Sequence, residues 1–492
     1  MKTLALVLLL NASGFAAEVP RATEADRAKP APVAVTAPAA AATAVKAALA
    51  NGLSLVLLES HRLPLVAVTL VIPQAGADAD PSGKEGLASL VAAMAKEGVT
   101  GLPSAAAFSN AVDDLGASLS VTSGADGMAV SVLVLKENLG RALELVGRVV
   151  REPSYLSGGP EATAAFKRLR QETLTGLEME KGDPAAVAGK RLAAGLFGDS
   201  PRGRAETEAS INSLTLAEVA ARHRASVVPN GAVLAVTGDV KLEELKALAA
   251  KNFGTWAPAA LPEAPQTPAT SAIVAEKTTS SAESGLVIEI VDMPGTQGEM
   301  MLGVKTLPRV DEQYDALSLA VAILGGPLVG RLDQNIREKN HWSYGARASL
   351  SAWKDGGMTQ METKVQLDKV GDALREILKE VERLRGETVP AEELSAAKAA
   401  LQGLFLQRNR TVQSRAARLA GLEAMGLPAS TMTDYPQRVE ALTAAQVQAA
   451  AAAWLGAQGL KIVIAGPAAA IAPQLKGLGQ VKIYSPDGKP RA

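Results

Sequence analysis

The sequence predicts an α+β fold of two homologous α/β-sandwich domains, each a mostly antiparallel sheet covered by helices on one face. Three observations predict it. Apolar residues alternate near the start of each half, as is typical of half-buried strands. Ala- and Leu-rich stretches with helical character follow in each half. The same order of elements then occurs a second time along the chain, which indicates an internal repeat.

Each half opens with two predicted strands. In the first half, alternation at residues 53–57 and 66–72 predicts two strands joined through Leu63-Pro64. In the second half, residues 287–291 and 300–304 occupy the same places. We therefore expect the two halves to begin alike.

A helix and a hairpin come next in each half. The predicted helices cover residues 85–96 and 314–324. Each is followed by a pair of strands, one turning at Gly127 and the other at Gly357, 230 residues later. This spacing is the first measure of the repeat.

The end of each half gives a second measure. Leu214 and Leu442 lie 228 residues apart in two similar heptapeptides. In both, a Thr at the N-cap and a Glu or Gln three residues later predict a capping box at a helix start. A closing strand is predicted after each helix, at residues 232–237 and 461–465. The two offsets agree, so we expect one plan used twice.

Composition excludes several classes of function. The 492 residues carry 50 basic and 51 acidic side chains, a net charge of −1, with no long basic run for a polyanion. Only 3% of residues are aromatic, which argues against base-stacking platforms. The absence of cysteine excludes disulfides, thiol catalysis and cysteine-ligated zinc. The three histidines, His61, His223 and His341, have no helical spacing that would bind a catalytic zinc ion.

The N-terminus predicts export. Residues 1–17 contain a basic start, a short apolar run and small residues, as a secretory signal peptide does, although a first strand or helix of the fold is the alternative. We expect the bacterial periplasm as the destination. An Ala/Pro-rich linker is predicted at 18–45 and a Pro/Thr/Ser-rich linker at 258–284. The two domains are then predicted at 46–257 and 285–492.

Several short phrases of the sequence carry a family resemblance, and they occur in a fixed order. They are Asn51-Gly52-Leu53, Gly83-Lys84-Glu85-Gly86-Leu87-Ala88, Leu115-Gly116-Ala117, Asp183-Pro184, Pro229-Asn230-Gly231, Leu324-Gly325-Gly326 and Ile336-Arg337-Glu338-Lys339. With these phrases the chain resembles the pitrilysin/insulinase family of zinc metallopeptidases, in its shorter form similar to the mitochondrial processing peptidase. The resemblance covers about residues 46–480.

The resemblance also predicts that the zinc motif is lost. Active members carry His-x-x-Glu-His after the Gly-Leu-Ala phrase, two zinc ligands and a general base. Ser89 and Ala93 stand at the histidine positions here, and Ala92 at the glutamate position. The third ligand, a glutamate on a downstream helix, aligns with Gly176, and Glu172 one turn earlier is a lone carboxylate. We therefore expect no metal in this chain and no peptide hydrolysis by the chain alone.

The second half keeps two residues that the family uses on substrate. The resemblance maps an arginine and a tyrosine, which hold substrate carbonyls and stabilise the oxyanion, onto Arg337 and Tyr344. The alternative is a purely structural role, in which the arginine pairs with Glu338 or Asp333 and the tyrosine packs at a strand start. Gly325 and Gly326 are expected to end a helix sharply and let a substrate strand approach the backbone.

Two-subunit members of the family suggest the function. In them one chain supplies zinc and the other the arginine and tyrosine. The sequence therefore predicts a non-zinc subunit of an exported heterodimeric metallopeptidase, with zinc in a homologous partner and an unfolded peptide as substrate. An inactive structural or scaffold protein of the same fold is the main alternative. A homodimer that binds peptides without cutting them is the third possibility.

Overall fold

The computed structural model describes residues 43–259, 286–327, 330–456 and 459–491. The predicted signal peptide and most of both predicted linkers lie outside the described residues. No helix among the described residues is long and apolar enough to cross a membrane.

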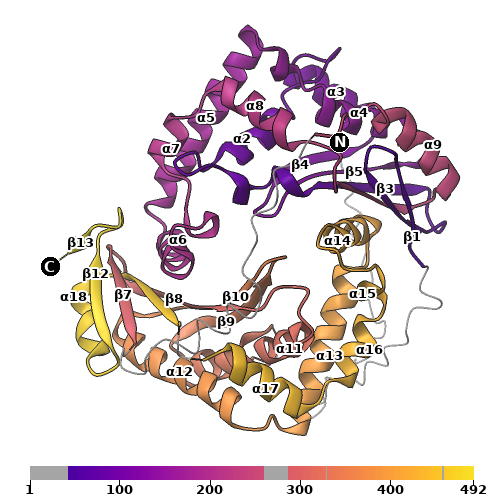
Figure 1. Ribbon diagram of the computed structural model, residues 1–492. Coiled ribbons are helices and arrows are strands. Elements are labelled where there is room, and N and C mark those ends of the chain that lie inside the picture. Colours follow the sequence, from indigo (N-terminus) through magenta and orange to yellow (C-terminus); the bar gives the residue numbers. More distant parts are fainter. Residues whose placement is uncertain (1–42, 260–285, 328–329, 457–458, 492) are drawn as a thin grey trace, which may run out of the picture. The chain divides into compact units, whose positions relative to one another are not determined.

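The first half is built on a six-stranded sheet in the order β1-β2-β6-β3-β5-β4 (Figure 1). Its strands are β1 Val45–Ala48, β2 Ser54–Glu59, β3 Leu65–Ile72, β4 Ser118–Ser123, β5 Met128–Leu135 and β6 Val233–Gly238. Only β2 and β6 pair in parallel, so the sheet is mostly antiparallel, as the sequence predicts.

The second half is built on a seven-stranded sheet in the order β13-β12-β7-β11-β8-β10-β9. Its strands are β7 Val287–Asp292, β8 Gln297–Thr306, β9 Ser343–Ala352, β10 Gly357–Gln366, β11 Lys461–Gly466, β12 Gln480–Tyr484 and β13 Pro490–Arg491. Here β11 and β12 pair with β7 in parallel, and the other neighbouring strands are antiparallel.

The two sheets share one topology, which confirms the predicted repeat. The order β2-β6-β3-β5-β4 in the first half is matched by β7-β11-β8-β10-β9 in the second. In both, the closing strand of the half lies between its first two long strands and runs parallel to the first of them. Among the described strands, the two strand orders differ only at the outer edge, which β1 forms in one case and β12 with β13 in the other.

Most helices of each half cover one face of its own sheet, and the exceptions are α6 and α14. Those of the first half are α2 Leu87–Met94, α3 Ala105–Asp113, α4 Leu139–Arg151, α5 Pro160–Glu180, α6 Pro184–Phe197, α7 Glu208–Asn212, α8 Leu216–Ser226 and α9 Leu242–Phe253. Those of the second half are α11 Tyr314–Gly325, α12 Val370–Gly386, α13 Ala391–Arg408, α14 Val412–Ala424, α15 Ser430–Thr433, α16 Tyr435–Ala441, α17 Ala444–Trp454 and α18 Ala468–Ile471. The predicted helix over 85–96 begins later, at Leu87, because Gly86 at its N-cap has a φ of 99°, and it ends at Met94.

Each half has a core of its own between its sheet and its helices. Leu55 and Leu57 of β2 belong with Leu143 of α4 to the first core, and Ile462 of β11 belongs with Leu317 of α11 to the second. Alternate residues of one strand therefore face the helices, and the residues between them face the other side of the sheet.

The other face of each sheet is covered by a helix from the opposite half. Leu419 of α14 packs with Val56 of β2 and Ala235 of β6, and Leu192 of α6 packs with Val463 of β11. Helix α6 contacts β8 and β11, whereas α14 contacts β3 and β6. The sequence predicts that helices cover one face of each sheet, and this is correct for the helices that belong to the same half. The prediction is incomplete because α6 and α14 cover the second face of the sheet in the opposite half.

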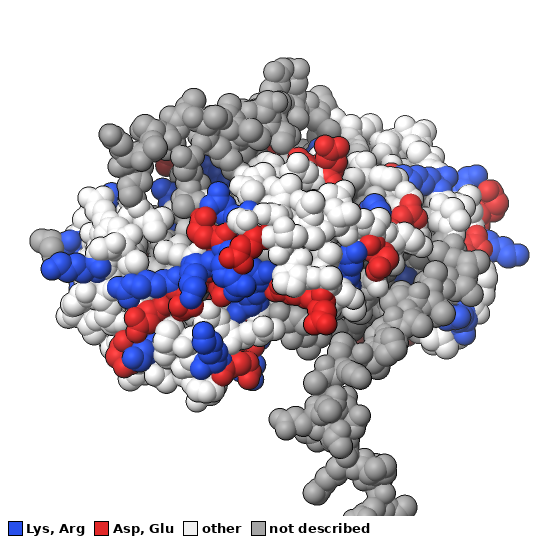
Figure 2. Space-filling model, turned by 90° about the horizontal axis from the view of Figure 1, so that it is seen from below, with Lys and Arg blue, Asp and Glu red and all other residues white. Residues whose placement is uncertain are grey.

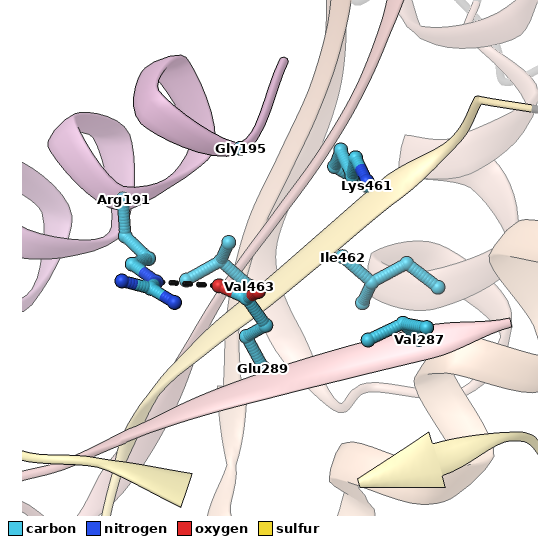
Figure 3. Close-up of a pocket in the computed structure, with 7 residues that line it drawn as sticks. All are labelled: Arg191, Gly195, Val287, Glu289, Lys461, Ile462 and Val463. Atoms are coloured by element: carbon cyan, nitrogen blue, oxygen red, sulfur yellow. Dashed lines mark hydrogen bonds and ion pairs between the residues drawn. The ribbon is translucent and has the colours of Figure 1, made fainter. Parts of the chain in front are cut away.

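Polar contacts support this exchange. Figure 3 shows Arg191 of α6 directed at Glu289 of β7, with which it forms an ion pair, and Val463 of β11 lines the same pocket. The Arg191 guanidinium also lies 3.6 Å from the centre of the Tyr484 ring. A residue just after α6 acts similarly, because Arg202 bridges Asp126 of the first half and Asp355 of the second.

Basic and acidic side chains lie next to each other on parts of the surface where ion pairs are frequent. Figure 2 shows basic side chains bordered by acidic ones on one face of the molecule. Helix α12 has this alternation in its i, i+3 ion pairs, such as Arg375 with Asp372 and Arg385 with Glu382. Such pairs make a solvated helix face and contribute little to stability.

Candidate functional site

Helix α2 carries the residues that align with the lost zinc motif. Ala92 is 3% exposed and packs in the first core. Ser89 points out of the core and donates its hydroxyl proton to Glu206 Oε1, at 2.8 Å. Glu206 precedes α7 and is 117 residues away in sequence, so no local spacing could have linked it to Ser89. The segment before α7 is thereby held against the face of α2 on which the motif would lie.

Further polar contacts fix the same segment to the start of α2. Arg204 Nε donates to Glu85 at 2.7 Å. Asp80 is buried, and both of its carboxylate oxygens accept the Ala88 backbone N–H at 3.1 Å in the first turn of the helix. Burial raises the pKa of Asp80, while the Ala88 N–H and the Arg222 guanidinium at 3.6 Å oppose that shift. A carboxylate at a helix N-terminus is a common stabilising arrangement.

The predicted third-ligand position does not complete a metal site. Gly176 lies in α5 with open space where a side chain would be, and Glu172 forms an i, i+4 ion pair with Arg168 at 2.8 Å. Among the described residues there is no group of three His, Asp or Glu side chains that could hold a metal ion. Ser89, Ala92, Ala93 and Gly176 together offer one hydroxyl, a donor set that does not fit zinc.

Arg337 lies in a π-helix, η6 Asp333–Lys339, which follows α11. Its side chain is 51% exposed, and its Nη1 lies 3.2 Å from Asp333 Oδ2. Its Nε lies 3.4 Å from Glu338. Both ion pairs expected for a structural arginine, with Asp333 and with Glu338, are therefore present, yet the guanidinium remains accessible to solvent. One-turn π-helices are often found at functional sites.

Tyr344 lies on a β-bulge at the start of β9. The pairing of β9 with β10 shifts between Thr363 and Val365, which pair with Ala346 and Ser343, so Tyr344 and Gly345 both lie opposite Lys364. The Tyr344 side chain is 95% exposed. A bulge re-aims a side chain relative to the regular pleat, and bulges are frequent beside active sites.

The bulge is held by hydroxyl groups. Ser343 Oγ donates to the Lys364 carbonyl at 2.7 Å and accepts from Gly345 N at 3.1 Å. Thr363 Oγ1 donates to the Gly345 carbonyl at 2.9 Å. The backbone that carries Tyr344 is therefore fixed although the phenol itself is exposed.

Asp333 joins the two residues. Its Oδ2 pairs with Arg337, and its Oδ1 accepts the backbone N–H of Ala346, next to the bulge, at 3.2 Å. One carboxylate thus positions the guanidinium and the strand that carries Tyr344. The sequence singled out Asp333 only as a possible ion-pair partner, because its second contact depends on the bulge.

Gly325 and Gly326 end α11, as expected. A Cβ at Gly325 would lie 2.3 Å from the backbone nitrogen of Ala348, and one at Gly326 would lie 2.6 Å from the Ala322 carbonyl oxygen. The backbone that approaches Gly325 is the chain's own β9. The approach of a substrate strand to these glycines stays a prediction.

The histidines have separate surroundings. His341 has a φ of 57° and its Nδ1 lies 3.1 Å from the Arg337 carbonyl oxygen, beside the Arg337–Tyr344 region. Exposed His61 contacts Asp239 and Glu59, and these carboxylates raise its pKa. Buried His223 contacts Tyr155 at 2.6 Å.

Comparison with known proteins agrees with this architecture. Residues 55–173 match the insulinase family (peptidase family M16), and residues 213–401 match the peptidase M16 inactive domain. An uncharacterized zinc protease of Mycobacterium leprae is 27% identical over 316 residues, which are 63% of this chain and 68% of that protein.

Solved structures share the fold over most of the chain. The peptidase M16 inactive domain from Pseudomonas fluorescens has a TM-score of 0.77 and 26% identity, and the match covers 86% of this chain and 98% of that one. The periplasmic protease PqqL from Escherichia coli has a TM-score of 0.70 and 17% identity, over 86% of this chain and 45% of its own. With both the N-terminal and the inactive-domain regions matched, this chain belongs to the insulinase family, peptidase family M16.

Proposed function

We propose that this chain is the non-zinc subunit of an exported heterodimeric zinc metallopeptidase. In this role it helps to enclose an unfolded peptide, and Arg337 and Tyr344 complete the active site of a homologous partner that has an intact His-x-x-Glu-His motif. Zinc belongs to the partner. The observation that carries the proposal is the exposure of Arg337 and Tyr344 on a backbone fixed by one carboxylate, Asp333.

The chemistry follows from the two side chains. A guanidinium and a phenol both donate hydrogen bonds, and donors aimed at the developing negative charge of a tetrahedral intermediate lower the barrier to peptide hydrolysis. Neither group needs a metal of its own. The positions on α2 and α5 where zinc ligands are expected hold Ser89, Ala92, Ala93 and Gly176, so the nucleophilic water has to be activated elsewhere.

Export is part of the proposal. The predicted signal peptide at 1–17 supports it, and the fold is shared with a protein described as a periplasmic protease. N-terminal sequencing of the protein recovered from the periplasm tests this point, with cleavage after Ala17 expected. Retention of residues 1–17 in the recovered protein contradicts it.

Reconstitution with a partner tests the catalytic role. The chain is co-expressed with a homologue that carries the intact motif, and zinc content and cleavage of an unstructured peptide are measured for each subunit and for the mixture. We expect activity only in the mixture, with zinc stoichiometric to the partner. A reconstituted complex without activity would favour the alternative, an inactive scaffold or peptide-binding protein.

Two substitutions test the residues. Loss of one oxyanion donor lowers kcat by about 10²–10³-fold, so Arg337→Ala and Tyr344→Phe are each expected to do so in the mixture. The matched control is Arg347→Ala, an exposed arginine on β9, the strand that carries Tyr344. An unchanged kcat in Arg337→Ala, or an equal loss in the control, refutes the catalytic role.

A further inference from the structure

Several arginines of the second half contact aromatic rings through their guanidinium groups. Arg418 of α14 has its guanidinium carbon 5.3 Å from the centre of the Phe405 ring of α13 and 5.9 Å from that of Tyr435 of α16. The two rings stack on each other, with centres 4.9 Å apart and an interplanar angle of 29°. Three helices therefore meet around one guanidinium.

A second arginine extends this arrangement. Arg309, in the loop between β8 and α11, lies 3.7 Å from the centre of the Tyr314 ring. Arg438 of α16 lies 6.0 Å from the Tyr435 ring and pairs with Asp315 at 2.7 Å. The chain has only 6 Phe and 5 Tyr residues, so three of them beside arginines is a marked local enrichment. We call Arg309, Arg408 and Arg418 with Tyr314, Phe405 and Tyr435 the basic-aromatic surface.

The charge of this surface is not compensated. None of its three arginines forms an ion pair with an acidic side chain within the described parts of the chain, in contrast to Arg375 or Arg438. Arg418 Nε is buried and has no hydrogen-bond partner among the described residues. Burial lowers the pKa of the Arg418 guanidinium, and the positive charges of Arg309 and Arg408 lower it further. A buried guanidinium that lies near other positive charges and has no counter-ion lowers the stability of the fold, and a bound anion would offset this cost.

Another arginine on the same helix continues the positive charge. Arg415 of α14 is half-buried, and burial and the charge of Arg62, in the loop between β2 and β3, both lower its pKa. Its Nε donates to the carbonyl oxygen of Thr411, and no described carboxylate forms an ion pair with it. Positive charge thus extends beyond the aromatic rings.

We infer that the basic-aromatic surface binds an acidic segment of an extended peptide, with peptide carboxylates paired to the guanidinium groups of Arg309 and Arg418. Planar guanidinium groups bind carboxylates through two parallel N–H donors, and arginine with tyrosine or phenylalanine is the composition of binding hot spots. The inference rests on the proposed function, because that function brings an unfolded peptide to this chain. It adds the charge of the peptide segment that is bound.

The geometry favours a peptide over single-stranded nucleic acid. Nucleic acids that bind such surfaces stack their bases on open aromatic faces. Here Phe405 and Tyr435 stack on each other, and a guanidinium lies over each of the three rings. The rings thus contact guanidinium groups or each other instead of presenting open faces to bases. Arg309 and Arg418 are half-buried and Arg408 is exposed, while Arg418 Nε is buried.

Binding to the purified chain alone tests the inference. Fluorescence anisotropy measures the Kd of a labelled, unstructured peptide of alternating Glu and Gly, at low and high ionic strength, beside its Lys counterpart. We expect the Glu peptide to bind and the Lys peptide not to bind. Arg418→Gln and Arg309→Gln are each expected to raise Kd about tenfold, as loss of one charge-assisted contact predicts. The control Arg375→Gln removes an equal charge from α12, and its Kd should stay within about twofold.

Several results overturn the inference. They are an unchanged Kd in both variants, an equal rise in the control, equal binding of the Lys peptide, and tighter binding of a single-stranded oligonucleotide of the same charge. Arg309→Gln changes a loop residue, so it remains informative if Arg418→Gln fails to fold, as thermal melting reveals. Because no partner is present in this assay, an inactive two-subunit mixture contradicts the proposed function without affecting this result.

Discussion

Replacing His223 by glutamine tests the buried polar contact of the first half. Val150 offers a carbonyl oxygen 2.9 Å from His223 Nε2, so Nε2 carries the proton and Nδ1 accepts the Tyr155 hydroxyl at 2.6 Å. This arrangement requires a neutral ring, and burial lowers the pKa of His223 to about 4. Glutamine also has one donor and one acceptor end but does not titrate near neutral pH.

The expected effect follows from the two pKa values. In the unfolded chain a histidine has a pKa of about 6.5, so between pH 6.5 and pH 4 the unfolded state binds a proton that the folded state excludes. Stability is therefore complete above the unfolded pKa and falls as the pH falls. Linkage with a folded pKa of about 4 gives a loss of about 2 kcal/mol between pH 7 and pH 5.

Urea unfolding at pH 7 and pH 5 measures this loss. We expect the free energy of unfolding of the unsubstituted protein to fall by about 2 kcal/mol more than that of His223→Gln over this range. His61→Gln is the control with opposite sign, because Asp239 and Glu59 raise the pKa of exposed His61. Its contribution is present below the unfolded pKa and is lost as pH rises. Equal pH dependence of the unsubstituted protein and His223→Gln would refute the reasoning.

Three further predictions concern caps, glycines and the candidate site. Thr215→Ala and Thr443→Ala each remove an N-cap acceptor and should lower the free energy of unfolding by about 1 kcal/mol, measured in urea; no change in either contradicts the capping role. Gly325→Ala places a Cβ 2.3 Å from a β9 backbone nitrogen and should cost about 3 kcal/mol, whereas Gly176→Ala, in open space within α5, should add about 0.5–1 kcal/mol. Asp333→Asn keeps the shape but loses the charge paired with the candidate arginine, and should lower kcat of the two-subunit mixture about tenfold while stability changes by less than about 1 kcal/mol; an unchanged kcat rejects the positioning role.

Local patterns made most of the fold predictable. The strands near 53–57 and 66–72 were predicted correctly in place, because apolar runs between turn residues are typical of strands. Their prediction as half-buried strands was wrong: Leu55 and Leu57 face the first core, and Val56 and Leu58 are buried on the other face, where α14 covers the sheet. The helix starts at Thr215 and Thr443 were readable because an N-cap bonds only to the next turn, and both capping boxes are present. The strand order within a sheet was not predicted, but its repetition in the second sheet followed from the internal repeat, since two halves with one element order were expected to fold alike.

Contacts between distant segments were not predictable from these patterns. The bond from Ser89 to Glu206 spans 117 residues, and nothing near Ser89 marks its partner. The second contact of Asp333 depends on a single extra residue in β9, and a bulge leaves no signature in apolar alternation. Leu192 of α6 reads as an ordinary core residue, so the sequence could not tell that its core lies in the other half.

The exchanged helices have a consequence for how the two halves are held together. Helix α6 begins at Pro184 and α14 at Val412, 228 residues later, and the strands that each one covers are equivalent in the two sheets. Each half thus contributes one helix to the sheet of the other half, at equivalent strands. This is the relation between the subunits of a twofold-symmetric dimer. Because one chain carries both halves, this pairing is intramolecular and does not depend on protein concentration, whereas the same pairing between two separate half-length chains would depend on it.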